Sequence, residues 1–581
     1  MDNGYANFEV KLSTLIEQIY PDENTGQLID RIVQTFWPMG LEQMVPERLP
    51  GNSLWSEDDI LVITYGNSVV DGTYKPLDLL HDFLKRYLTD MVSGVHILPF
   101  FPYTSDDGFA VTDYCAVNGL LGDWEDINRI AGEFKLMSDL VLNHVSSQSN
   151  WFNDYLQGHE PYDRFFYEAL PSDDLSEVVR PRTSPLLRKV ETKNGPRHVW
   201  CTFSHDQVDL NFKNPDVLVE FLRIMRLHID NGVRILRLDA VAFLWKEIGT
   251  NCVHLPETHA VVRLMRLLLD YTDEEVVLLT ETNVPNAENL SYFGNRNEAH
   301  AIYNFSLPPL ILHALLTGTS QHLIRWQMAM PPAQLGCAYL NFTASHDGIG
   351  MRPAEGLLSE AEIDSVIGAV KSFGGLVSMR SLPDGTERPY ELNITFFEAM
   401  KGTVEGVDAF QMERFLCSQT IMMALEGIPA FYIHSLVATP NDYEGVEKSN
   451  HNRAINRHRW DYPELREKLD DASSMQARVY AALKGRMAIR RKQPAFHPNA
   501  TQFTMQLGDK IFAFWRQSMN RDQSIFALHN VSREEVLVSA VSINLIGGEN
   551  WYDLLTGEKI AADSGDIVFA PYQCRWITNR N

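Results

Sequence analysis

The feature that most constrains the fold is a series of eight short apolar runs that alternate with helix-like segments. Buried parallel strands read as continuous apolar runs, because helices cover the faces of their sheet. Eight strands that alternate with helices are typical of an α/β fold closed into a (β/α)8 TIM barrel. We therefore predict strands at residues 61–66, 94–101, 136–144, 232–239, 276–282, 301–306, 338–347 and 427–435.

The rest of the chain predicts additions to this barrel, which we place at residues 58–490. Residues 1–57 carry apolar side chains at helical spacing, which predicts an N-terminal helical extension. Short alternating runs in residues 491–581 predict a small C-terminal β domain. The gaps at about 148–205 and about 350–405 are too long for crossover helices and predict inserts after strands 3 and 7.

Charge and cysteine content exclude several classes of partner. The formal net charge of -26 repels nucleic acid and anionic membrane surfaces, so we expect neither as a partner. The six cysteines are scattered, no apolar run is long enough to span a membrane, and the first residues lack a secretory signal, which favours a cytoplasmic protein. No nucleotide-binding loop or metal-ligand cluster is evident, so we predict no cofactor and no metal. The sequence does not decide whether the protein forms a homodimer.

Ionisable side chains stand at the ends of four predicted strands, where barrel enzymes carry their catalytic residues. A single carboxylate there could equally cap a helix or form a salt bridge. Three carboxylates on one rim indicate an active site instead. The residues are His144 on strand 3, Arg237 and Asp239 on strand 4, Glu281 on strand 5, and His346 and Asp347 on strand 7.

This set of side chains suits glycosyl transfer with retention of configuration. Such enzymes use a nucleophilic carboxylate and a second carboxyl group about 5 Å away that donates and then accepts a proton. Arg237 lies two residues before Asp239, so both face the same side of the strand and the arginine would keep Asp239 ionised. Glu281 must hold a proton near neutral pH, which requires a raised pKa. Asp347 could hold two sugar hydroxyls.

Four segments, DLVLNH, GVRILRLDA, LLTETN and TASHD, resemble the signature segments of the α-amylase family (glycoside hydrolase family 13) in the same order. A fifth, QVDLN at 207–211, is similar to the family's motif in the insert after strand 3. The resemblance implies that Asp239 is the nucleophile, Glu281 the acid/base and Asp347 the transition-state stabiliser. It also implies that His144, His346 and Arg237 contact the sugar or the nucleophile.

Within that family the chain resembles the sucrose-phosphorylase branch, through GVHILPFFP, SDDGF, ETNVP, SLPPLILHALLTG, SHDGIG and RAINRH. These enzymes exchange an α-glucosyl group between an acceptor hydroxyl and inorganic phosphate. The resemblance implies that Asp106 and Arg453 hold the distal hydroxyls of glucose, and that Phe109 shapes the sugar platform.

Several segments differ from the sucrose phosphorylases and indicate a smaller group within this branch. The N-terminal extension, the loop DGTERPYELN with Tyr390-Glu391 in place of a Tyr-Gln pair, and NDYEGVEK resemble the glucosylglycerate phosphorylases. That implies reversible phosphorolysis of 2-O-α-D-glucosyl-D-glycerate to α-D-glucose 1-phosphate and D-glycerate, by double displacement through a β-glucosyl-enzyme. A phosphorylase for sucrose, sucrose 6′-phosphate or glucosylglycerol stays an alternative, as does an α-glucoside hydrolase or transglycosidase. An inactive scaffold is disfavoured because all three carboxylates are present.

The acceptor site must attract anions, since phosphate and glycerate are both negatively charged. An acidic protein repels both at long range, so the site needs local positive charge, preferably from arginine. The resemblance places Arg182 of VVRPRTSPLL in this site with Tyr390, next to Glu391, although a surface ion pair is the alternative for Arg182. For Arg180, a surface ion pair is the preferred interpretation.

Phosphate must also outcompete water, which a closed pocket beneath the second insert would favour. Gly374, Gly375, Pro383 and Gly385 are compatible with a mobile lid there, or with an ordinary long loop.

Overall fold

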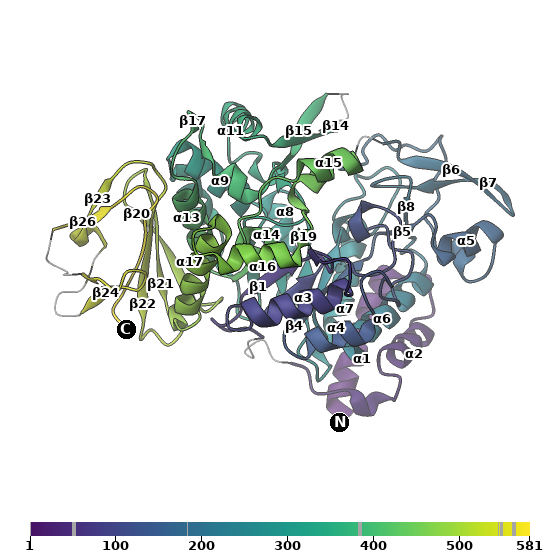
Figure 1. The fold of residues 1–581 in the computed structure, drawn as a ribbon. Coiled ribbons are helices and arrows are strands. Elements are labelled where there is room, and N and C mark those ends of the chain that lie inside the picture. Colours follow the sequence, from purple (N-terminus) through teal and green to yellow (C-terminus); the bar gives the residue numbers. More distant parts are fainter. Residues whose placement is uncertain are drawn as a thin grey trace.

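Eight parallel strands close into the predicted barrel in this computed structural model (Figure 1). The structure describes residues 2–48, 54–182, 184–381, 386–543, 545, 550–560 and 565–580. Every barrel strand coincides with one of the eight apolar runs, so the predicted (β/α)8 fold is confirmed. The strands are β1 (Leu61–Thr64), β3 (Gly94–Ile97), β4 (Lys135–Val141), β9 (Val233–Asp239), β10 (Val277–Thr280), β11 (Ala301–Tyr303), β12 (Ala338–Phe342) and β18 (Ile428–Tyr432).

Local signals in the sequence begin the helices that surround the barrel. Asp123 and Asp126 form a capping box at the start of α4 (Trp124–Ala131). Asn214 caps α6 (Pro215–Asp230), and a proline occupies its first turn, where no backbone N–H is needed. The other helices packed around the strands include α3 (Pro76–Phe83), α7 (Pro256–Asp270), α9 (Leu307–Thr317), α10 (Gln321–Ala329), α13 (Gln411–Ala424) and α17 (Met475–Arg490).

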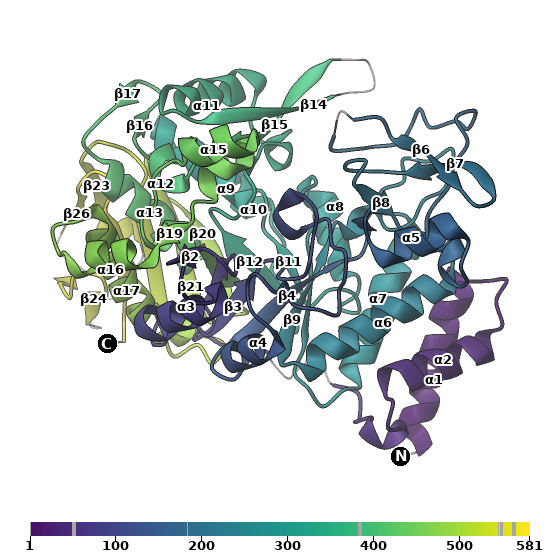
Figure 2. The same ribbon diagram turned by 45° about the vertical axis from the view of Figure 1, so that its right-hand side comes forward.

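Two inserts rise from the same end of the barrel, as Figure 2 shows. The first contains β5 (His144–Ser146), α5 (Asn150–Gln157), β6 (Leu187–Thr192), β7 (Gly195–Trp200) and β8 (Gln207–Asp209). The second contains β13 (Ile349–Gly350), α11 (Glu360–Ser372), β14 (Leu376–Ser381) and β15 (Glu387–Asn393), with its strands in the order β13-β15-β14. Of the residues that suggested a lid, Pro383 and Gly385 lie outside the described part of the chain.

The two ends of the chain fold as the predicted helical extension and β domain. Helices α1 (Asp2–Ile19) and α2 (Thr25–Phe36) pack against α7 and α6 (Figure 2). The C-terminal β domain contains a six-stranded antiparallel sheet and a two-stranded one. Its strands are β20 (Thr501–Gln506), β21 (Ile511–Gln517), β22 (Ser524–Asn530), β23 (Val536–Ser539), β24 (Trp551–Asp553), β25 (Lys559–Ile560), β26 (Asp566–Phe569) and β27 (Cys574–Thr578). The domain boundaries at 57 and 490 stay predictions.

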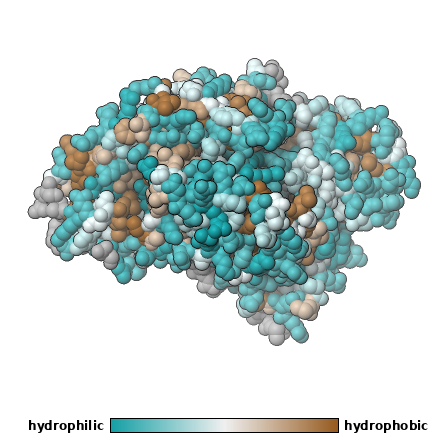
Figure 3. Space-filling view, viewed as in Figure 1, coloured by the Kyte–Doolittle hydropathy of each residue, from teal (hydrophilic) through white to brown (hydrophobic). Residues whose placement is uncertain are grey.

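Hydrophilic residues predominate on the face of the molecule shown in Figure 3, and hydrophobic ones form small separate groups. Over the residues that the structure describes, no helix is both long enough and apolar enough to cross a bilayer.

The N-terminal extension is fastened to the barrel by aromatic packing, which predicts a measurable contribution to stability. The buried ring of Phe8 meets Trp37 at 5.4 Å and Tyr271, which follows α7, at 5.0 Å between ring centroids. We expect Phe8→Ala to lower the free energy of unfolding by about 3–5 kcal/mol, the usual loss for a buried phenylalanine. Thermal and urea unfolding would measure this change.

Val10→Ala is the matched control, because Val10 lies on the same helix and is 66% exposed. Its effect should stay within about 0.5 kcal/mol. An unchanged main unfolding transition in Phe8→Ala would mean that the extension does not stabilise the barrel.

Candidate active site

A cavity of about 740 Å³, including the part open to solvent, lies at the carboxyl ends of the barrel strands. It is lined by every site residue proposed from the sequence except Arg237, which lies buried beneath it. The lining residues from that set are Asp106, Phe109, His144, Arg182, Asp239, Glu281, His346, Asp347, Tyr390, Glu391 and Arg453.

The floor of the cavity is a buried ionic network on neighbouring strands. Arg237 on β9 donates to Asp239 Oδ1 at 2.6 Å and also to Asp139, which faces it on β4. Asp139 is bonded in turn to His96 of β3 at 2.7 Å. Burial raises the pKa of Asp139, but His96 and Arg237 outweigh it and lower this pKa to about 2. Arg237 is thus held by one carboxylate and presented to the other.

Glu281 lies beside Asp239 because of the strand register. Thr280 on β10 pairs with Leu238 on β9, so the next residue on each strand, Glu281 and Asp239, are neighbours. Adjacent strands lie about 4.8 Å apart, close to the separation of carboxyl groups in retaining glycosidases. The side chain of Glu281 also accepts a hydrogen bond from the amide of Ala240 at 3.4 Å. The register thus makes Asp239 and Glu281 neighbours, and both side chains line the cavity, as a retaining mechanism requires.

Ionising both of these buried carboxyl groups at once is energetically unfavourable. Burial raises the pKa of Asp239 well above its usual range, and it raises the pKa of Glu281 too; Arg237 opposes both shifts. Such a pair keeps one shared proton at pH values at which each carboxyl group alone would be ionised. Arg237 donates directly to Asp239 but lies 3.9 Å from Glu281. We therefore assign the proton to Glu281 and the negative charge to Asp239.

Asp347 is ionised as well, and it is the one of the three carboxyl groups whose pKa is lowered. Its Oδ1 lies 2.6 Å from Arg453 and 3.9 Å from Arg457. Burial raises its pKa, but the positive charges of Arg453, Arg457 and Arg237 outweigh that effect and lower it. The neighbouring His346 stacks on Phe109 with ring centroids 5.0 Å apart, and burial and Arg457 lower its pKa well below the usual value. His346 is therefore a neutral group that can donate or accept a hydrogen bond.

Another part of the cavity lining comes from the loop after β3 and from the first insert. His144 Nε2 lies 3.1 Å from the Phe109 carbonyl oxygen and 3.1 Å from Gln207 Nε2. It donates to the carbonyl when it carries a proton and accepts from the Gln207 amide group when it does not. Gln207 also donates to Asp106 at 3.2 Å. Asp106 and Gly108 have left-handed backbones, and a Cβ on Gly108 would meet the Pro99 carbonyl at 2.8 Å. The SDDGF motif therefore fixes this tight loop and aims Asp106 into the cavity.

Glu391 lines the cavity, but its carboxylate is already paired with an arginine. It is buried on β15 and paired through both oxygens with Arg453, whose Nε lies 3.0 Å from Oε2. Arg453 in turn holds Asp347. Glu391, predicted as a substrate-binding residue, thus reaches the site through Arg453, and Arg453 joins the second insert to the catalytic rim.

Two arginines at the cavity mouth face no carboxylate within 4 Å in the described part of the chain. Arg182 lies over the rings of Phe203 and Tyr390, at 5.8 Å from each centroid. Arg352, which follows β13, also lines the cavity and was missed by the sequence reasoning. Arg180 points elsewhere, because it donates to the carbonyls of Ser184, Cys201 and Thr202. Arg182 and Arg352 therefore bring positive charge to the cavity without forming an ion pair within 4 Å among the described residues.

Further residues were missed for want of a sequence signal. Asp139 and His96 sit inside apolar runs, and Arg457 was not separated from its neighbours in HNRAINRHR. Gln207 was visible within QVDLN but had no assigned role. Phe203, Phe243 and Asn283 also line the cavity.

A buried lysine beside the site pairs with one carboxylate and donates to one amide oxygen. The ammonium group of Lys246 lies 2.7 Å from Asn143 Oδ1 and 2.9 Å from Asp209 Oδ2. Both oxygens therefore already face a positive charge. Among the described residues, a cluster with metal-ligand spacing occurs at another place, formed by His313, His322 and Glu362.

Comparison with known proteins matches this fold and these motifs. Residues 82–343 match the family model described as "Alpha amylase, catalytic domain". The glucosylglycerate phosphorylase of Spirochaeta thermophila is 42% identical over 92% of this chain and 92% of its own. That of Escherichia coli K12 is 36% identical over 98% and 99%. The crystal structure of sucrose 6F-phosphate phosphorylase from Thermoanaerobacter thermosaccharolyticum superposes with a TM-score of 0.71 at 24% identity, over 88% of this chain and 98% of that one.

The barrel and its paired carboxyl groups define a glycoside-processing (β/α)8 enzyme. The sequence similarities identify a narrower family than the fold does, since two relatives match over nearly their whole length. The chain belongs to the glucosylglycerate phosphorylase family, within the α-amylase family whose catalytic-domain model it matches.

The proton assigned to Glu281 predicts how the first chemical step responds to pH. Because the pKa of Glu281 is raised, the acid form persists to higher pH, and kcat/KM for an O-glucoside should fall as pH rises through that value. Glu281→Gln should lower this kcat/KM by about 100-fold or more. α-D-Glucosyl fluoride needs no protonated leaving group, so fluoride release by Glu281→Gln should be largely retained and lack the alkaline fall.

Glu288→Gln is the control, since Glu288 lies in the following helix and pairs with His254 instead. Equal losses of Glu281→Gln on the fluoride and the O-glucoside would contradict the acid role.

Proposed function

We propose that this protein catalyses the reversible phosphorolysis of 2-O-α-D-glucosyl-D-glycerate, giving α-D-glucose 1-phosphate and D-glycerate with retained configuration. The observation that carries the proposal is the similarity to two glucosylglycerate phosphorylases at 42% and 36% identity over more than nine-tenths of the chain. The solved phosphorylase structure, at 24% identity, supports the fold alone.

The geometry supports a double displacement. Asp239 attacks the anomeric carbon while Glu281 protonates the glycosidic oxygen, so glycerate leaves and a β-glucosyl-enzyme forms. Phosphate then enters the vacated position, gives its proton to the Glu281 carboxylate and attacks the same carbon. Asp239 leaves, and α-D-glucose 1-phosphate is formed. Asp347, held by Arg453, would hold sugar hydroxyls most strongly as the ring distorts and positive charge develops.

The two arginines at the mouth suit the anions that this cycle requires. Glycerate departs before phosphate arrives, so one positively charged position can serve the carboxylate and then the phosphate. Arg182 and Arg352 line the cavity, and neither has a carboxylate within 4 Å among the described residues. Their charge is local, which matters in a chain with a net charge of -26.

We further propose that the reaction needs no metal or organic cofactor, with inorganic phosphate as the co-substrate. The Lys246 ammonium group already donates to Asn143 Oδ1 and pairs with Asp209 Oδ2, the two oxygens beside the site. The proposed cytoplasmic location rests on six free thiols, which suit a reducing compartment.

Phosphate dependence tests the function directly. With glucosylglycerate as substrate, glucose 1-phosphate should appear in proportion to added phosphate, and Asp239→Ala should lower the rate by several orders of magnitude. Release of free glucose at the same rate without phosphate would instead identify a hydrolase. Faster turnover of sucrose, sucrose 6′-phosphate or glucosylglycerol would identify one of the alternative phosphorylases.

The acceptor role of the arginines predicts a selective loss. In the synthetic direction, Arg182→Ala and Arg352→Ala should each lower kcat/KM for glycerate by at least about 30-fold, since removing one partner of a desolvated charge pair costs about 2 kcal/mol or more. The loss for neutral glycerol should be much smaller. Phosphate release from glucose 1-phosphate at fixed donor concentration measures both.

Arg197→Ala is the matched control, because Arg197 lies in the same insert but pairs with Glu168 at the surface. Equal losses for glycerate and glycerol would contradict a carboxylate-binding role.

A further inference from the structure

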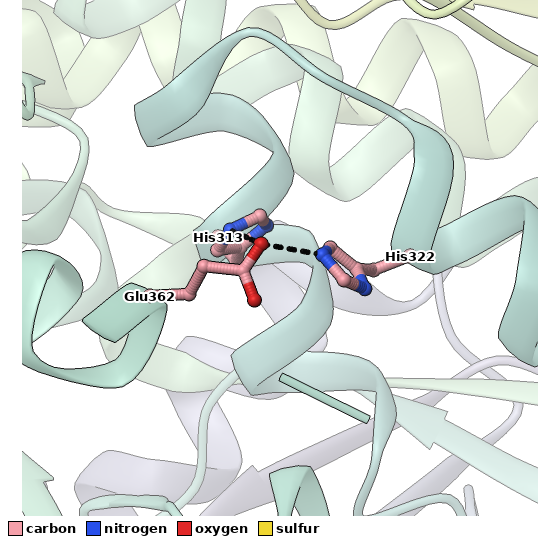
Figure 4. Close-up of side chains that lie close together, drawn as sticks. All are labelled: His313, His322 and Glu362. Atoms are coloured by element: carbon pink, nitrogen blue, oxygen red, sulfur yellow. Dashed lines mark hydrogen bonds and ion pairs between the residues drawn. The ribbon is translucent and has the colours of Figure 1, made fainter. Parts of the chain in front are cut away.

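A compact group of two histidines and one glutamate lies outside the active site, at the seam between the barrel helices and the second insert. His313 comes from α9, His322 from α10 and Glu362 from α11. Figure 4 shows the carboxylate of Glu362 between the two imidazole rings. Glu362 Oε1 lies 2.7 Å from His322 Nε2 and 3.9 Å from His313 Nε2. One oxygen and two ring nitrogens thus converge on a single point.

These separations suit a coordinated ion. Zn²⁺ binds histidine nitrogen and carboxylate oxygen at about 2.0–2.2 Å, so two of its ligand atoms lie at most about 4.2 Å apart. Both separations from the glutamate oxygen are within this limit, and all three ligand atoms lie within 4.8 Å of one another. Small rotations of the side chains would bring them to tetrahedral spacing.

His313 supplies an independent observation that points to a ligand. Its side chain is 2% exposed, and it makes no hydrogen bond with the described residues; its Nδ1 is buried and unpartnered, while its Nε2 faces the glutamate from 3.9 Å. Burial of Nδ1 without a hydrogen-bond partner is unfavourable, because that nitrogen has lost its contact with water. A cation between Nε2 and Glu362 would satisfy the nitrogen that faces the cluster.

Glu362 is oriented as a ligand from outside the cluster. Its other oxygen, Oε2, accepts hydrogen bonds from the Ser359 amide at 2.8 Å and from the Ser359 hydroxyl at 2.7 Å. Supporting hydrogen bonds of this kind hold the carboxylates of metal sites in place. Glu362 is also 35% exposed, so the group opens to solvent on the side of α11 and an ion can enter.

We propose that His313, His322 and Glu362 bind one divalent cation of the zinc class, with water completing the coordination. Two imidazoles and a carboxylate form a ligand set that Zn²⁺ uses in proteins, whereas Mg²⁺ and Ca²⁺ prefer oxygen ligands. The ion would tie α11, at the start of the second insert, to two helices of the barrel. That insert continues into β15, which carries Tyr390 and Glu391, so the ion stabilises the element that forms the acceptor wall.

Zinc binding to the folded enzyme tests the site. Metal-free protein, titrated with Zn²⁺ by calorimetry and by equilibrium dialysis, should bind one ion per chain at this site and unfold at a higher temperature when it is bound. Glu362→Gln and His322→Gln should each weaken binding by at least about 100-fold, since even changes to supporting groups cost 10- to 100-fold. Both variants should keep the wild-type catalytic rate without metal.

His81→Gln is the matched control, because His81 faces Glu133 at 3.1 Å without a second histidine. It should leave zinc affinity and the zinc-induced stabilisation unchanged. If the wild-type protein binds no zinc, or if Glu362→Gln and His322→Gln bind it as tightly as His81→Gln does, the proposal is wrong. Using two cluster variants keeps the test valid if one of them fails to fold.

Discussion

The active site depends on one buried guanidinium, that of Arg237. Its Nη1 donates to both Asp139 and Asp239, and its Nη2 lies 3.9 Å from Glu281. A buried carboxylate is expensive without a partner, so this cation is what allows charged groups to gather at the barrel floor. Its position closer to Asp239 stabilises the ionised form of that carboxyl group more than the ionised form of Glu281.

The other cations of the site fall into two groups with different tasks. Arg453 and Arg457 are committed to acids, since Arg453 pairs with Asp347 and Glu391 and Arg457 pairs with Asp107. These contacts fix the rim and keep Asp347 charged. Arg182 and Arg352 lie farther out and have no such partner in the described residues. The cavity therefore contains positively charged groups outside these ion pairs, although the protein as a whole is strongly acidic.

Much of the fold could be predicted from the sequence because the barrel strands are buried on both faces. Burial forces each one to be an apolar run, and an ionisable residue at its carboxyl end stands out against that background. The same logic failed for Asp139 and His96, which lie within the runs and whose function is to hold Arg237. Their meaning depends on strand register, which a single sequence does not reveal.

Contacts between residues far apart in the sequence also limited what could be predicted about the site. Arg352 lies in a stretch of ordinary composition, and its place at the cavity depends on how the second insert packs on the barrel. Glu391 was predicted to bind substrate, which stays a prediction; its buried pairing with Arg453, 62 positions along the chain, could not be read from the sequence. The three residues of the proposed cation site, likewise, come from separate helices that only the folded chain brings together.

The central claim is that glucose is held covalently on Asp239 between the two displacements. Incubation with a 2-deoxy-2-fluoro-α-glucosyl donor slows the second displacement, and mass spectrometry of the digested protein locates the label. The account predicts one fluoroglucosyl group on the peptide that contains Asp239, released faster when phosphate is added. A label on any other residue, or turnover that never passes through a labelled enzyme, would contradict it.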